Sequence, residues 1–163
     1  MYIEKYWGDY IGGTDDSLTL TDYLAMKGKK EISLEEIFAD FGADTLFGDF
    51  RQTNPPLVFR NPEGWEMGLE CAIDLVSDLA ALLLECKVNG SVDLLELDET
   101  LELEEDDSII RIAAAPKESE QINKILADFA DSPAAYDISE FVSAADLRGL
   151  AAACRELREE LFG

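Results

Sequence analysis

One apolar stripe constrains the fold of this chain more than any other feature. Between residues 75 and 86, apolar side chains recur at positions i, i+1, i+4, i+7, i+8 and i+11, namely Leu75, Val76, Leu79, Leu82, Leu83 and Cys86. This spacing places all of them on one face of an α-helix. Because such a face must be covered by other elements, we expect this helix to lie at the centre of the core.

Just before this helix the hydrophobic period is two. Apolar and other residues alternate from 65 to 73, which predicts a half-buried strand. Residues 57–60 are expected to pair with it through the turn 61–64, which has Pro62 at its second position. Further strands are predicted at residues 1–7, 92–97 and 109–114, with a hairpin over residues 95–103.

Capping residues mark the other helices. Ser33, with Glu36 three residues later, predicts a short helix that ends at Gly42. A helix around Leu20 and Leu24 is expected to have Thr19 or Asp16 as its N-cap. Two more helices are predicted, one from Pro116 to the Ser132-Pro133 pair and one that follows Ser143 to the end of the chain.

The strands are short and mostly joined by hairpins, and the longer helices are not each followed by a strand. This order predicts an α+β fold, an antiparallel sheet of about five strands with helices packed mainly on one face. A doubly wound parallel sheet is the alternative. With 163 residues and no linker rich in Pro, Gly or Ser, residues 1–163 are expected to form a single domain.

The composition excludes most catalytic chemistry. The chain contains no histidine, so an enzyme built on it would depend on carboxylates, lysine, tyrosine or cysteine. Its three cysteines are too widely spaced for a metal motif and suit a reducing cytoplasm. No stretch has the length of a signal peptide or a membrane span. We therefore expect a cytoplasmic protein with no catalytic residue, no metal and no cofactor.

The charge is concentrated in residues 93–107, here called the acidic segment. It holds nine acids, and no basic residue occurs between Lys87 and Arg111. The whole chain has a formal net charge of -23. Such a field attracts a basic protein and repels nucleic acid and anionic membranes, so we expect a basic partner and neither of the other two. The alternative is that the segment serves only solubility.

Candidate partner-binding residues come from this segment and from the N-terminal aromatic cluster. In the acidic segment they are Asp98, Glu99, Glu102, Glu104, Glu105, Asp106 and Asp107. Trp7 and Tyr10 are candidate interface anchors, because Trp and Tyr are favoured at binding hot spots; packing at the edge of the core is the alternative. The acids lack the spacing of a calcium-binding EF-hand loop, since position 6 counted from Asp98 is leucine rather than glycine.

Residues 6–18, which read YWGDYIGGTDDSL, and residues 72–86, which read AIDLVSDLAALLLEC, resemble segments of small bacterial proteins. In size, acidity and α+β pattern, the whole chain is similar to the immunity proteins of polymorphic and contact-dependent-inhibition toxins. The resemblance implies a non-enzymatic inhibitor that binds a basic toxin. The alternatives are an interaction module or nucleic-acid mimic with another basic partner, and an enzyme that uses carboxylates.

Overall fold

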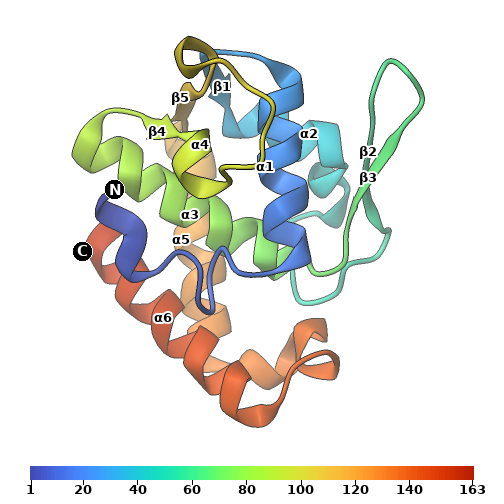
Figure 1. Ribbon diagram of the computed structural model, residues 1–163. Helices are drawn as coiled ribbons and strands as arrows, with labels where there is room; N and C mark the ends of the chain where they lie inside the picture. Colours follow the sequence, from blue (N-terminus) through green and yellow to red (C-terminus); the bar gives the residue numbers. More distant parts are fainter.

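The computed structural model describes residues 1–163, and Figure 1 shows how its elements are arranged. The α-helices are α1 (Asp15–Lys27), α2 (Leu34–Phe41), α3 (Ala72–Asn89), α4 (Leu94–Leu97), α5 (Pro116–Asp131) and α6 (Ala144–Phe162). Short 3-10 helices are η1 (Tyr2–Lys5), η2 (Ala43–Leu46), η3 (Glu105–Asp107), η4 (Pro133–Ala135) and η5 (Asp137–Glu140). The strands are β1 (Glu31–Ser33), β2 (Leu57–Arg60), β3 (Glu66–Leu69), β4 (Val92–Asp93) and β5 (Ile109–Ala113).

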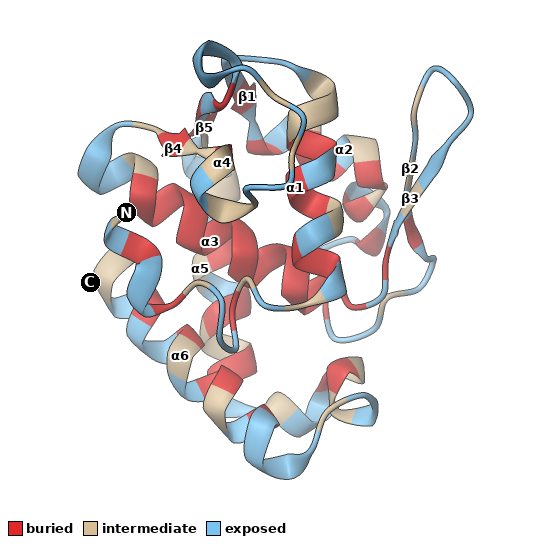
Figure 2. Ribbon diagram, viewed as in Figure 1, coloured by how far each residue is buried: buried red, intermediate tan, exposed pale blue.

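The helix predicted from the apolar stripe, α3, is the centre of the molecule. Every residue from 72 to 85 is buried, so the helix is covered on all sides and not along the stripe alone (Figure 2). It contacts α1, α5, α6, η1, β4 and β5. Buried apolar side chains from all these elements join one contiguous core. The prediction of a central helix is confirmed.

The α+β class is confirmed, but the predicted five-stranded antiparallel sheet is wrong. One sheet has three strands in the order β1-β5-β4, with β1 parallel and β4 antiparallel to β5. The hairpin β2-β3 forms a separate two-stranded sheet that projects from the body (Figure 1). Helices make up most of the molecule, and α3 packs mainly against other helices rather than on one large sheet.

The capping predictions are largely correct. Ser33 Oγ accepts the amide of Glu36 at 3.1 Å, and Gly42 ends α2 in the left-handed conformation. Pro116 is the first residue of α5, and Ser143 caps α6. The cap of α1 is different from the prediction. Thr14, rather than Thr19 or Asp16, accepts the amide of Ser17, which leaves the Asp16 carboxylate free for another role.

The strand predicted over residues 65–73 is too long, because β3 ends at Leu69. Asp16 in α1 accepts the amides of Glu70 and Cys71 at 2.8 and 3.0 Å, and Cys71 is the N-cap of α3. These amides are therefore directed at α1 and not at a partner strand. The alternation of apolar residues continued through this point, although the backbone had already turned into a helix.

Two further strand predictions are wrong. The predicted strand over residues 1–7 is replaced by η1 (Tyr2–Lys5) and the turn after it, because the carbonyl of Ile3 accepts the amides of Tyr6 and Trp7. Strand β4 covers only two residues of the predicted range 92–97, because the Asp93 side chain accepts the amide of Leu95 at 3.0 Å and begins α4. The expected hairpin over residues 95–103 is consequently replaced by α4 and a loop.

Candidate functional site

The acidic segment begins in β4, forms α4 and continues as a loop through η3 toward β5. Six of its seven candidate carboxylates are exposed, namely Glu99, Glu102, Glu104, Glu105, Asp106 and Asp107. Asp98 is half-buried, and its Oδ1 accepts the amide and the hydroxyl of Thr100 at 2.9 and 2.6 Å. Asp98 thus shapes the loop, whereas the other six face solvent.

No basic side chain neutralises these carboxylates. None of the ion pairs in the structure includes an acid of the segment. Lys30 approaches it but donates to the main-chain carbonyl of Asp106, at 3.1 Å. Burial and the nearby charge of Asp98 together raise the pKa of Asp22 in α1. The charge of the segment is therefore unpaired and acts on its surroundings.

Trp7 and Tyr10 lie apart from the acidic segment, in the loop between η1 and α1 (Figure 1). The half-buried Trp7 ring packs on Gly12, where an added Cβ would come within 2.2 Å of the ring. The Tyr10 ring lies in the same way against Gly149 of α6, and 38% of the residue remains exposed. The structure thus divides the predicted site residues between two regions, and both aromatic side chains pack against a glycine while part of each residue stays exposed.

A cluster of buried carboxylates is the feature that the sequence analysis missed. Asp16 and Asp78 are only 4% and 2% exposed. Asp78 accepts the amide of Gly12 at 3.0 Å and the hydroxyl of Ser17 at 2.7 Å. The amides of Glu70 and Cys71, just before α3, donate to Asp16, and all these contacts together fix the segment GGTDDS against the central helix.

Asp74 is the least satisfied member of this cluster. It is 6% exposed, and its only hydrogen-bonding neighbour is another acid, Asp16. Burial, the hydrogen bond to Asp16 and the charge of Asp78 all raise the pKa of Asp74. Burial also raises the pKa of Asp78 to about 7, although its bonds from Ser17 and Gly12 oppose the shift. Without a nearby cation, buried carboxyls of this kind favour the neutral form.

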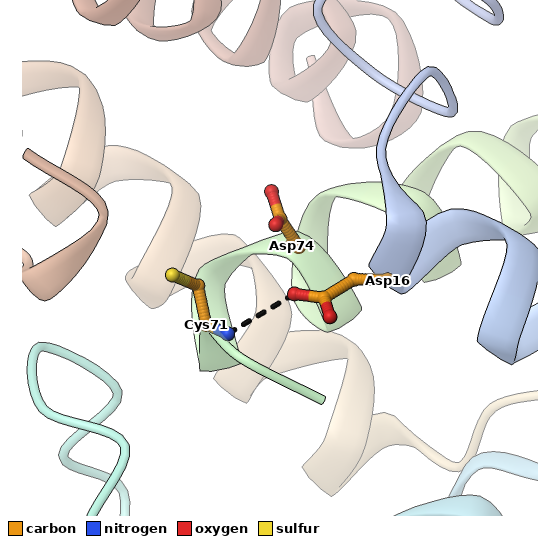
Figure 3. Close-up of side chains that lie close together, drawn as sticks. All are labelled: Asp16, Cys71 and Asp74. Carbon is orange, nitrogen blue, oxygen red and sulfur yellow. Dashed lines mark hydrogen bonds between the residues drawn. The ribbon is translucent and has the colours of Figure 1, made fainter. Parts of the chain in front are cut away.

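Asp16, Cys71 and Asp74 also bring together donor types that bind metal ions (Figure 3). One ligand atom from each lies within 4.8 Å of the other two, and all three residues are buried. However, both oxygens of Asp16 already accept backbone amides. Burial raises the pKa of the Cys71 thiol, which opposes formation of the thiolate that a metal requires. The local chemistry thus explains these residues as helix cap and core.

A comparison with protein families decides the class of the molecule. Residues 2–161 match the family model described as Immunity protein 68. The chain belongs to this immunity protein family. No curated protein and no solved structure matches it.

Membership of the Immunity protein 68 family confirms the resemblance to immunity proteins of toxin systems. It supports an immunity-type function and a toxin as binding partner, and immunity families are generally not enzymes. None of the helices is both long enough and apolar enough to cross a membrane.

A signal for the buried cluster was present in the sequence of this immunity protein. Asp74 and Asp78 are four residues apart, so they share one face of a helix that is mostly apolar. Two acids on such a face indicate either an exposed stripe or buried partners. The partners, Gly12, Asp16 and Ser17, are about 60 residues away along the chain, in a segment where Asp16 was predicted only as a possible helix N-cap.

Proposed function

We propose that this protein neutralises a basic bacterial toxin by binding it in the cytoplasm, and that the acidic segment provides much of the attraction. Family membership supports the inhibition of a toxin. The observation that supports a basic partner is the run of exposed carboxylates from Glu99 to Asp107, which takes part in no ion pair.

The attraction of a basic partner depends on how the exposed carboxylates are hydrated and on how far their field extends. Exposed carboxylates stay hydrated until a partner arrives. Dissolved ions screen their field over about one Debye length, roughly 8 Å at physiological ionic strength. A concentrated field of one sign raises association rates with an oppositely charged protein by roughly 10 to 10³. If the toxin acts on nucleic acid, these carboxylates are suited to the positions that phosphates would take on it.

The test is a titration of toxin activity. The toxin to be tested is the product of a toxin-like gene found beside the gene for this chain, and increasing amounts of the purified protein are added to it. We expect activity to disappear at one equivalent. A toxin that stays fully active at excess protein, with no complex detected by gel filtration, would contradict the proposal.

A matched pair of variants tests the role of the acidic segment. The first neutralises four of its exposed acids, by Glu102→Gln, Glu104→Gln, Glu105→Gln and Asp106→Asn. The control neutralises four exposed acids elsewhere, by Glu63→Gln, Asp131→Asn, Glu140→Gln and Glu159→Gln. Both variants change the net charge equally. We expect only the first to need a clear excess over the toxin for full inhibition, and equal behaviour would show that total charge alone matters.

A further inference from the structure

A hollow of about 300 Å³ lies between the N-terminal loop, η5 and the first half of α6. Three of the residues that line it are acids, namely Asp9, Asp74 and Asp146. No lysine or arginine is among the lining residues. Asp9 and Asp146 are exposed, whereas Asp74 is nine-tenths buried. The hollow therefore has an acidic rim and a carboxyl in its interior.

The Asp74 carboxyl is unusual because no N–H group or cation of the protein satisfies it. Figure 3 shows it rising from α3, with the Cys71 thiol and the Asp16 carboxylate on either side below it. The charged groups that act on it, Asp16, Asp78 and Asp137, are all acids. One oxygen of Asp137 is itself buried without a hydrogen-bond partner. A buried carboxylate is stabilised only by a partner of opposite charge or by donors, and the protein supplies neither to Asp74.

The walls of the hollow suit a long side chain with a charged end. Ile138, Val142 and Leu150 provide apolar surface for methylene groups. The Tyr10 ring forms another wall and is kept in place by Gly149, since even a Cβ at that position would come within 2.2 Å of the ring. An aromatic ring beside carboxylates is a favourable setting for a guanidinium group, which stacks on the ring and donates to the acids.

We propose that this hollow binds an arginine side chain of the toxin, with its guanidinium group stacked on Tyr10 and donating to Asp74, and its stem lying along the apolar wall. The inference rests on the proposed function, because it names the anchor that the basic partner inserts. Arginine fits better than lysine, since its planar fork presents five donors to several carboxylates at once. Steering by the acidic segment and anchoring in this hollow are separate contributions to binding.

The first test needs no toxin. The probe is N-acetyl-arginine amide, added to the full-length protein while amide shifts are followed by NMR. The control probe is N-acetyl-citrulline amide, which has nearly the same shape and no charge. We expect saturable shifts around Tyr10, Thr14, Asp74 and Leu150 with the arginine probe only. Equal shifts with both probes, or no saturable shift with either, would overturn the proposal.

Two variants separate the interior of the hollow from its rim. Asp74→Asn removes the carboxyl that would become charged when a guanidinium binds, with little change of shape. We expect it to weaken binding of the arginine probe about tenfold or more, as for loss of a hydrogen bond between charged groups. Asp146→Asn removes a rim charge and should weaken binding less. A dissociation constant that Asp74→Asn leaves unchanged would contradict the assignment.

The toxin complex then distinguishes this inference from the proposed function. In surface plasmon resonance, we expect Asp74→Asn to speed dissociation of the toxin and to leave the association rate almost unchanged. If the toxin is neutralised but dissociates from Asp74→Asn at the wild-type rate, the hollow is not the anchor and the proposed function stands. If the wild-type protein does not bind the toxin at all, the proposed function fails, and the assignment of a toxin arginine fails with it.

Discussion

Asp78 is the residue that holds the N-terminal loop on the central helix. It accepts the Gly12 amide and the Ser17 hydroxyl while itself fully buried. Replacing it with alanine leaves the Gly12 N–H without a partner, whereas Ser17 keeps Thr14 as a neighbour at 3.1 Å. We expect Asp78→Ala to lower the free energy of unfolding by about 1 to 3 kcal/mol. Urea denaturation at pH 6 measures this, with the exposed Asp131→Ala as the control, which should change little.

The same residue makes stability depend on pH. Its pKa rises from 3.8 to about 7 on folding, so the folded state binds the proton more tightly than the unfolded state does. The corresponding stability is fully present below about pH 4 and is lost as the pH rises through about 7. The charge of Asp16 raises the pKa of Asp78 as well, and the charge of Asp78 in turn raises the pKa of Asp74. Between pH 5 and 8 we expect the wild type to lose more unfolding free energy than Asp78→Asn, and parallel losses would show that Asp78 does not titrate in this range.

At the scale of elements, α3 begins where it does because of a carboxylate from another helix. Asp16 of α1 accepts the two amides that precede α3, while the N-cap residue Cys71 provides no side-chain cap. Asp16→Ala should therefore cost about 2 to 4 kcal/mol of unfolding free energy, as the loss of a cap together with a buried acceptor. The neighbouring Asp15→Ala is the matched control, since Asp15 is exposed in the same turn. Equal effects of the two substitutions would contradict the capping role.

The elements that sequence predicted well are those defined by local signals. The apolar stripe of α3 and the Ser33 cap of α2 depend on residues within about three turns of each other, so pattern and structure agree. The errors occur where a distant contact decides. The alternation up to Ile73 continued past the point at which Asp16 ends β3, and a side chain 54 residues away leaves no local signal. The hollow beside Asp74 likewise brings together four separate segments and could not be predicted.

For the whole molecule, the charged surface and the core should be separable. The acidic segment is exposed and unpaired, so neutralising Glu102, Glu104, Glu105 and Asp106 removes repulsion without removing contacts. We expect this fourfold variant to keep or increase its unfolding free energy. Leu79→Ala, at a fully buried position of α3, should instead cost about 2 to 5 kcal/mol. A clearly lower melting temperature for the fourfold variant than for the wild type would show that the segment is structural.

The association rate with the toxin tests most directly whether unpaired acidic charge guides this protein to a basic partner. Stopped-flow measurements compare the wild type with the fourfold variant and with the control that neutralises Glu63, Asp131, Glu140 and Glu159. Because steering acts through a screened field, the wild-type rate should fall steeply, by about tenfold or more, between low and physiological salt. The fourfold variant should start lower and fall less than the control. A wild-type rate that is indifferent to salt and to these acids would contradict the account.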